Sequence, residues 1–178
     1  MANLVKNGNF DKQTLTGNAQ SGVPTDWTCL NTPGIASFSV YRRDAVPASI
    51  TQFAYFTNTT LSQIINFPKS GNYILSYWLA FNSSNNESTI TIGSLISNKF
   101  LPNTFTISKW NNYQTPFYVS SGNLTQQLSF KVTVLDDWLT GVSIVPVAFD
   151  YTLDLYLEWI PDDNYPAFDT YKNKRLIY

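Results

Sequence analysis

Residues 72–81 read NYILSYWLAF, and the side chains in this stretch alternate in kind along the chain. The odd-numbered positions hold large apolar side chains: Tyr73, Leu75, Tyr77, Leu79 and Phe81. The even-numbered positions after Asn72 are mixed: Ile74, Ser76, Trp78 and Ala80. A period of two places one set on a packed face and the other on a wetter face, which is typical of strands in antiparallel sheets.

The same period recurs along most of the chain. It is strong at Leu128–Leu135 and Tyr151–Trp159. Weaker strands are predicted at Ala36–Tyr41, Ser49–Phe56, Leu61–Phe67, Ser88–Ile96, Thr115–Val119 and Ser143–Ala148. Turn signals such as Pro33-Gly34, Gly122-Asn123 and Asp136-Asp137 separate them, and no stretch has a helical period. This spacing predicts an all-β fold, either a sandwich or a barrel.

Length and composition bound the organisation of the chain. The 178 residues suit one sandwich domain over residues 1–160, with residues 161–178 as a separate C-terminal arm or tail. Charged residues make up only 13% and the net charge is −1, so a phosphate-neutralising surface for nucleic acid is not expected. No run of 18 apolar residues is present, so membrane insertion is not expected either.

The residue types in this sequence exclude most kinds of catalytic site. The sequence has no histidine and one cysteine, Cys29, which excludes Ser-His-Asp and Cys-His nucleophiles and His- or Cys-based zinc sites. No phosphate-cradling glycine loop is present. Glu87 and Glu158 are the only glutamates, and Glu158 falls on a regular predicted strand. We therefore expect a protein that is not an enzyme.

Four pieces of the sequence, in order, carry a family resemblance. The first is Asn3-Leu4, Asn7-Gly8, Phe10-Asp11, Pro24 and Trp27, and the second is LSQIINFPKSGNYILSYWLA at 61–80. The third is Trp110 with Leu128-Ser129-Phe130, and the fourth is VAFDYTLDLYL at 147–157. Together they resemble the galactose-binding-like jelly-roll superfamily, which includes many carbohydrate-binding modules and a plant cell-wall family. The resemblance implies an all-β fold, a two-sheet antiparallel jelly-roll sandwich.

This resemblance implies two further expectations. The acidic residue after the first Phe and the acidic residue of the closing strand often help to hold a structural calcium ion in that superfamily. Here these are Asp11 and Asp150, and hard oxygen ligands of this kind suit calcium. The framework tryptophans of the superfamily are Trp27 and Trp110 in this chain, and we expect both to pack in the core.

Candidate sugar-binding residues follow from the pattern of aromatic and polar side chains. Trp78 lies on the strand face opposite Tyr77 and Leu79, with Ser76 beside it. Trp138 follows the Asp136-Asp137 pair and is expected in a loop. The remaining candidates are polar or aromatic groups that could contact a sugar: Tyr41, Arg42, Asp154 and Tyr156. Each tryptophan could instead serve packing alone.

Two functions remain open at this point. The first, which we favour, is a structural protein in a large assembly, such as a minor capsid or surface component of a virion. The alternative is a carbohydrate-binding module that stacks a sugar on surface aromatics. The C-terminal segment supports the first, because its apolar side chains suit an arm that docks on a partner: Tyr165, Phe168, Tyr171, Leu176, Ile177 and Tyr178.

The expected localisation depends on which of these two functions the chain has. No apolar signal segment precedes the first predicted strand. We therefore expect a place in a virion or another assembly, or else a cytoplasmic location or export without a signal peptide. Protein partners, carbohydrate, or both are expected.

Overall fold

The computed structural model describes residues 2–31, 33–39, 45–83, 87–101, 104, 106–133 and 137–147. These residues belong to one compact unit, Met1–Val147. The predicted strand Tyr151–Trp159, the predicted boundary near residue 160 and the C-terminal arm lie outside the described residues.

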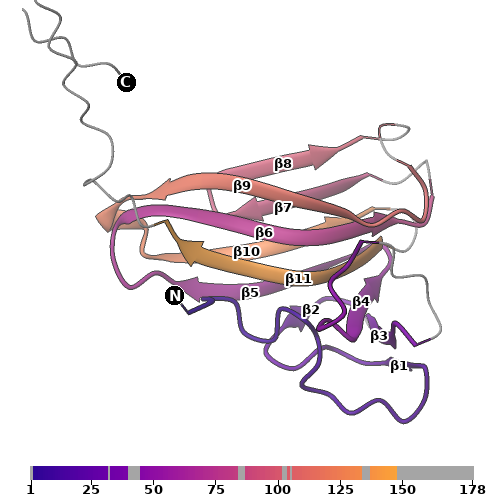
Figure 1. The fold of residues 1–178 in the computed structure, drawn as a ribbon. Coiled ribbons are helices and arrows are strands. Elements are labelled where there is room, and N and C mark those ends of the chain that lie inside the picture. The colour runs from indigo at the N-terminus through magenta and orange to yellow at the C-terminus, as the bar shows by residue number, and fades with distance from the viewer. Residues whose placement is uncertain are drawn as a thin grey trace, which may run out of the picture. The chain divides into compact units, whose positions relative to one another are not determined.

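The described chain forms two antiparallel sheets that pack face to face (Figure 1). The six-stranded sheet has the order β1 (Ala19–Ser21), β3 (Gly34–Ser37), β4 (Gln52–Phe56), β11 (Asp137–Pro146), β6 (Gly71–Phe81) and β9 (Asn111–Val119). The five-stranded sheet has the order β2 (Thr28–Cys29), β5 (Thr59–Asn66), β10 (Thr125–Val132), β7 (Ser88–Ile92) and β8 (Ile96–Phe100). A short 3-10 turn at Ser121–Asn123 is the one helical element among the described residues. The predicted two-sheet antiparallel sandwich is therefore confirmed.

The core lies between the two sheets, where the period of two predicts it. The apolar set of β6 is buried throughout: Tyr73, Leu75, Tyr77, Leu79 and Phe81. From the facing sheet, Leu128, Phe130 and Val132 of β10 are buried as well. Phe130 packs edge-on against Tyr77 with ring centroids 5.4 Å apart. Burial of each such side chain stabilises the fold by about 1.5–3 kcal/mol, so this layer supplies most of the driving force.

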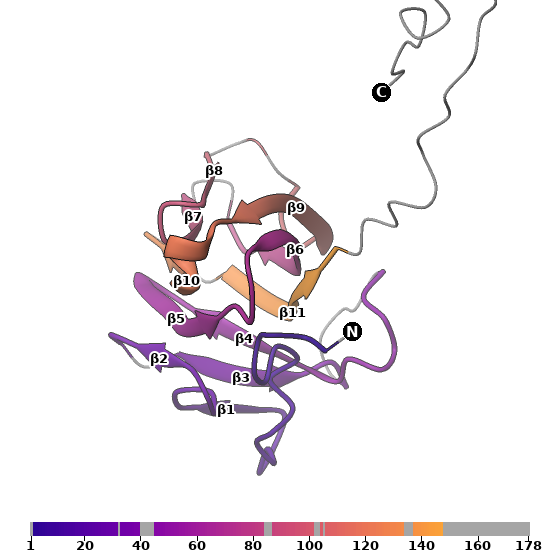
Figure 2. The same ribbon diagram turned by 90° about the vertical axis from the view of Figure 1, so that its left-hand side faces the viewer.

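Figure 2 looks along the strands and shows β8 and β9 next to each other at one edge of the sandwich. Contacts between these two edge strands close that side. Asn98 Nδ2 donates to Thr115 Oγ1 at 2.8 Å, and Phe100 contacts Tyr113 at 4.9 Å between ring centroids. No helix in the described part of the chain is both long and apolar enough to cross a lipid bilayer.

The bounds of several predicted strands differ from the structure. The stretch Ser88–Ile96 is not one strand, because Gly93 at φ 47° turns the chain and starts β8. The edge strand β9 begins at Asn111 rather than Thr115, because its first outward residues are polar and mask the pattern. The pair Asp136-Asp137 was expected in a turn, but Asp137 is buried, opens β11 and accepts a hydrogen bond from Ser88.

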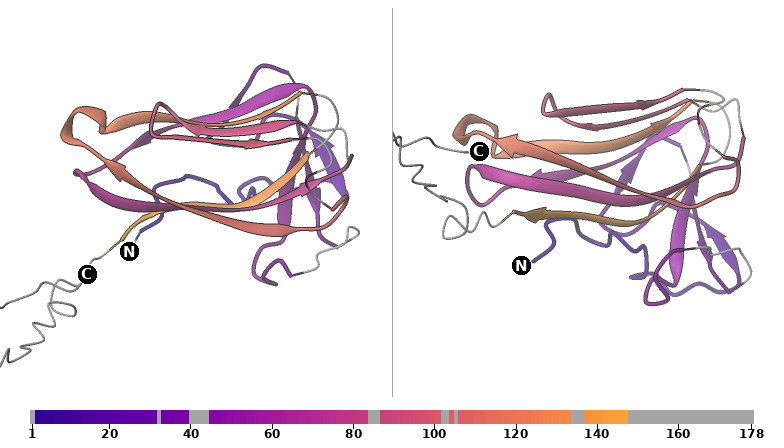
Figure 3. Two further views of the ribbon diagram at one scale, coloured as in Figure 1. Left: turned by 90° about the horizontal axis from the view of Figure 1, so that it is seen from above. Right: turned by 45° about the horizontal axis from the view of Figure 1, so that its top comes forward.

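The N-terminal segment runs beside β11 and continues the sheet where β4 ends (Figure 3). Leu4 N donates to Ile144 O at 2.9 Å, and Val142 N donates to Gly8 O at 3.0 Å. A Cβ on Gly8 would lie 1.9 Å from the carbonyl oxygen of Val142. The Asn-Gly pair of the first motif is thus explained by a close approach of two backbones.

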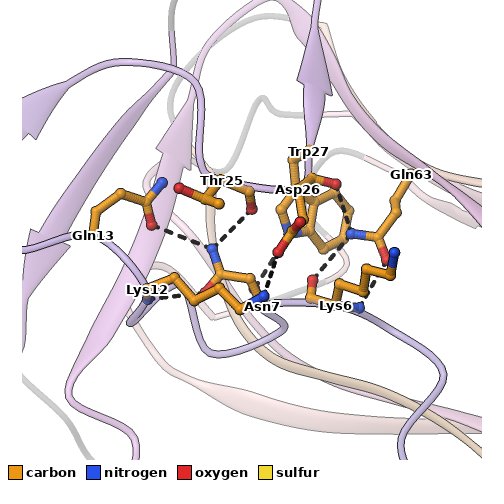
Figure 4. Close-up of polar contacts among 8 residues, drawn as sticks. All are labelled: Lys6, Asn7, Lys12, Gln13, Thr25, Asp26, Trp27 and Gln63. Carbon is orange, nitrogen blue, oxygen red and sulfur yellow. Dashed lines mark hydrogen bonds and ion pairs between the residues drawn. The ribbon is translucent and has the colours of Figure 1, made fainter.

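Buried amide groups tie this segment to the five-stranded sheet and to the loop before β2 (Figure 4). Asn7, at φ 50°, donates from Nδ2 to Thr25 O at 2.9 Å and accepts from Lys12 N at 3.1 Å. Trp27 Nε1 donates to Asn7 O at 3.2 Å. Gln63 of β5 accepts from Lys6 N at 2.8 Å, and its Nε2 donates to the carbonyl oxygens of Lys6 and Asp26 at 3.0 and 2.8 Å. One side chain therefore joins β5 to two loops.

The Gln63 bridge gives a stability prediction. Gln63→Ala leaves backbone groups of Lys6 and Asp26 without partners in a buried site, so the free energy of unfolding should fall by about 3 kcal/mol. Gln127→Ala, at an exposed position of β10 whose side chain has no hydrogen bond in the structure, is the matched control and should change it by less than about 0.5 kcal/mol. Urea titration followed by circular dichroism measures both. Equal stability of the two variants would contradict the assigned role of Gln63.

Candidate functional site

The outer face of the six-stranded sheet carries the candidate site. Directly paired residues of neighbouring antiparallel strands point to the same face of a sheet. The pairing of β6 with β9 and β11 therefore defines thirteen outward side chains: Asn72, Ile74, Ser76, Trp78, Ala80, Asn112, Gln114, Pro116, Tyr118, Trp138, Thr140, Ser143 and Val145. None of these side chains carries a charge.

A second apolar cluster covers one part of this face. Its buried members are Ala36, Phe38, Val46, Ile50, Phe53, Ala80 and Trp110. Phe38, Phe53 and Trp110 contact one another with ring centroids 5.0 to 5.5 Å apart. The other part, over β6 and β9, is open, because Asn112, Gln114, Pro116 and Tyr118 are all exposed.

Trp78 stands at the border between the covered and the open part. Its half-buried ring packs against the second cluster. It also lies over Gly141, because a Cβ built on Gly141 would be 2.9 Å from Trp78 Cδ1 and 3.0 Å from Ile50 Cδ1. The structure gives the indole N–H of Trp78 no hydrogen-bond partner among the described residues, and this nitrogen is not one of the buried unpaired atoms. The N–H is therefore available to a ligand.

Neutral polar groups lie next to Trp78 on the open side. Asn112 is paired with Trp78 across the strands, and Gln114 is paired with Ser76. Gln114 Nε2 donates to Asn112 Oδ1 at 3.3 Å, and Asn112 Nδ2 donates to Tyr77 O at 3.4 Å. Ser143 of β11 is paired with Ser76 on the opposite side. Amides and hydroxyls thus border a partly exposed indole ring.

Two tyrosines, Tyr77 and Tyr113, lie beneath the open part of this surface. Burial raises the pKa of Tyr77 to about 12 and raises the pKa of Tyr113. The amide of Asn98 lies close enough to oppose the shift of Tyr77, but its geometry makes no hydrogen bond to the buried Tyr77 Oη. Both phenols therefore stay protonated at neutral pH, and the polarity of the face comes from its own amides and hydroxyls.

Trp138 lies on β11 and not in a loop, so that expectation was wrong. It points outward and packs on the second cluster, 5.6 Å from Phe53 and 6.2 Å from Trp110 between ring centroids. Packing is its visible role. Trp27 and Trp110 are buried, as expected for framework residues, although Trp110 belongs to the second cluster rather than to the core between the sheets.

The other candidate residues are not brought together in the described structure. Tyr41, Arg42, Asp150, Asp154, Tyr156 and the arm residues Tyr165, Phe168, Tyr171, Leu176, Ile177 and Tyr178 all lie outside the described residues. Asp11 is described and exposed. Within the described ranges, no three His, Cys, Asp or Glu side chains lie close enough together to hold a metal ion.

Sequence reasoning missed three residues of the open face: Asn112, Gln114 and Tyr118. A signal for them exists, because they alternate with the inward residues Tyr113, Thr115 and Phe117. The signal is weak because most outward residues of this edge strand are polar and two of its inward residues, Tyr113 and Thr115, are only partly buried. Gly141 was missed as well, since a single glycine in a strand pattern does not reveal which ring lies over it.

Comparisons with known proteins identify the fold. No protein-family model matches this sequence, and no curated protein matches it. A solved structure of TmCBM61 in complex with β-1,4-galactotriose is similar with a TM-score of 0.60 and 12% identity, over 83% of this chain and 100% of that chain. The enzymatically active domain of tailspike protein 4 of bacteriophage CBA120 is similar with a TM-score of 0.54 and 14% identity. That match covers 82% of this chain and 21% of the tailspike chain. These similarities show the fold alone, a two-sheet jelly-roll sandwich, which the sequence resemblance implies.

A structural calcium ion at Asp11 and Asp150 stays a prediction. Calcium takes six to eight oxygen ligands, and the described residues supply the carboxylate of Asp11 without the second acidic partner. If the ion binds, a chelator should lower the melting temperature of the wild-type chain, because a ligand of the native state stabilises it. Asp11→Ala should remove this response, and Asp26→Ala, which loses the ion pair with Lys12, should keep it. Differential scanning calorimetry with and without chelator tests this; a wild-type melting temperature that chelator leaves unchanged contradicts it.

Proposed function

We propose that this chain is a non-catalytic carbohydrate-binding domain that holds a saccharide on the outer face of the six-stranded sheet, with Trp78 as the stacking ring. The observation that carries the proposal is the border position of Trp78. Its ring lies over Gly141 and packs on the second cluster, its N–H has no hydrogen-bond partner among the described residues, and neutral amides lie beside it.

The chemistry of a sugar matches this arrangement. A pyranose ring has an apolar face of C–H groups and an edge of hydroxyl groups. An indole offers a large flat apolar surface with one polar N–H, and this surface suits the C–H face of the sugar. The hydroxyl edge of the sugar can exchange hydrogen bonds with neutral polar side chains. These are the amides of Asn112 and Gln114 and the hydroxyls of Ser76 and Ser143. Few placed polar groups around an apolar surface are typical of small-molecule sites.

The similarity to TmCBM61 supports the class of ligand. That protein has this fold and was solved with β-1,4-galactotriose, and the match extends over its whole length. The similarity concerns the fold, so the sugar and the position of the site are proposed from the residues of this chain.

We also propose, from the residue types on the same outer face, that this chain does not catalyse a reaction. Glycoside hydrolysis generally needs two carboxyl groups flanking the bond that is cut. The outward positions of β6, β9 and β11 hold no carboxylate, and Asp137 of β11 points inward and is buried. With no histidine in the chain, no imidazole can act as general base.

A second candidate function is a structural component of a large assembly, such as a minor capsid or surface protein of a virion. One observation favours it: part of a bacteriophage tailspike has this fold. The apolar C-terminal segment, residues 164–178, would supply the docking arm. The two functions are compatible, because a virion surface protein can bind glycans of its host.

The carbohydrate proposal makes a direct prediction. On an array of neutral glycans, the wild-type chain should bind a defined set, and Trp78→Ala and Gln114→Ala should lose it. Trp78→Ala also removes packing and must be shown to be folded by circular dichroism. Gln114 is exposed, so Gln114→Ala should keep the wild-type melting temperature and report on binding alone.

Gln127→Ala is the control, since this exposed glutamine lies on the outer face of the other sheet and should bind as the wild type does. No binding by the wild type, or binding that survives both Trp78→Ala and Gln114→Ala, would contradict the proposal.

The assembly function makes a separate prediction. Deletion of residues 164–178 should abolish self-association or incorporation into particles, because the docking side chains are removed. Sedimentation of the purified full chain and of the truncated chain measures this, with the glycan binding of both as a control for folding. Full-length protein that stays monomeric and gains no partner through this segment would argue against the assembly role.

A further inference from the structure

We infer that the proposed site is a strip that runs along β6 and β9 from Trp78 to Tyr118, and that it takes an extended, uncharged glycan rather than one terminal sugar. This inference rests on the proposed function and adds the size and charge class of the ligand.

The register of the two strands gives the length of the strip. Trp78 is paired with Asn112 at one end, and Asn72 is paired with Tyr118 at the other. Trp78 lies six positions after Asn72 on β6, so the two ends are on the order of 20 Å apart at about 3.3 Å per residue. This is several times the width of one sugar ring, so an oligosaccharide could contact both ends at once.

The two ends of the strip offer aromatic rings. Trp78 is half-buried, and the Tyr118 side chain is 59% exposed. A single exposed tyrosine is ordinary on a protein surface. The placement of Tyr118 on the same face as Trp78, at the opposite end of the same paired strands, is what gives it a role.

The middle of the strip alternates between polar and apolar rows across three strands. Ser143, Ser76 and Gln114 form the row next to Trp78. Val145, Ile74 and Pro116 form the next row toward Tyr118. A sugar chain in an extended conformation presents hydroxyl edges and C–H faces along its length, which such rows can contact in turn.

The absence of charge selects the class of glycan. The strip holds no lysine or arginine to pair with a sulfate or uronate, and no acidic residue to pair with an amino sugar. The outer face of the other sheet differs, because it presents Lys99 and Lys131, and Lys99 pairs with Glu87 at 2.8 Å. Anionic chains would therefore have to leave their charges unpaired on the strip, which is unfavourable.

A strand from another protein is a poorer occupant of this region. β9 is the edge strand of its sheet, and an edge can pair with a foreign strand. Pro116 interrupts that edge, because proline lacks an N–H and breaks the ladder of donors. The open face of β6 and β9, rather than the edge, is thus the surface that remains available.

The experiment compares chain lengths. Isothermal titration uses the di- and hexasaccharides of β-1,4-galactan, cellulose, xylan and mannan as probes. The wild-type chain should bind at least one hexasaccharide about tenfold more tightly than its disaccharide, the factor that 1.4 kcal/mol of extra contact gives. Tyr118→Ala should remove this advantage and leave disaccharide binding unchanged, whereas Trp78→Ala should weaken both.

Ile64→Ala is the matched control, because Ile64 is 56% exposed on the outer face of the other sheet. It should leave both affinities unchanged. Oligogalacturonate hexasaccharide should bind at least tenfold more weakly than the best neutral hexasaccharide.

The outcomes separate the two proposals. If no probe binds the wild type, the proposed function and the strip fail together. If binding depends on Trp78 but is equally tight for short and long chains, the strip fails and the proposed function stands. The same holds if the tighter binding of the hexasaccharide survives Tyr118→Ala. If the oligogalacturonate binds as tightly as the neutral chains, the inferred charge class is wrong.

Discussion

The pairing of β11 with β6 is the constraint on which the candidate site depends. Along β11 the inward residues are Asp137 and Leu139 before the irregularity, and Val142 and Ile144 after it. The inward positions change from odd-numbered to even-numbered residues at Gly141. This residue adopts φ 60° at the point where the register between β11 and β6 shifts, between Thr140 and Ser143. Such a bulge inserts one residue and restores the phase of the strand. Without it, Ser143 and Val145 would face the core, and Ile144 would face water.

The same bulge connects the outer face to the rest of the fold. Trp78 occupies the space over Gly141, so a side chain at position 141 would displace the ring proposed to stack on the ligand. On the other side of the strand, the backbone of Val142 is bonded by the N-terminal segment through Gly8 and Asn3. Gln63 and Asn7 then hold that segment against the five-stranded sheet. The framework motifs near the N-terminus and the site on β6 are therefore connected through β11. Gly8 lets the N-terminal backbone approach β11 closely, and Gly141 lets the Trp78 ring do the same.

The sequence predicts the elements whose period is unbroken, and it fails where the period breaks or weakens. For β6 and β10 the inward apolar residues are regular, and their buried faces were predicted residue by residue. In β11 the bulge at Gly141 disrupts the alternation, so its first half was assigned to a turn and Trp138 to a loop. For the candidate site, alternation alone singles out Trp78. Asn112 and Tyr118 depend on the register between β6 and β9, which is a long-range property that a linear pattern does not contain.

The outer face of the six-stranded sheet has a covered part and an open part, and we assign binding to the open part over β6 and β9. Over β4 and the near end of β11, the second cluster already covers the sheet, and Thr140 there is fully buried with its hydroxyl donating to Gln52 O at 2.7 Å. Over β9 nothing in the described structure covers the outward side chains, although Tyr118 and Pro116 there present apolar surface to solvent. The strands beneath are long, paired and packed on the core, so the backbone that carries the strip is held in place before any ligand arrives. A surface that is preorganised in this way loses little conformational entropy on binding, which favours recognition of a long, weakly contacting chain.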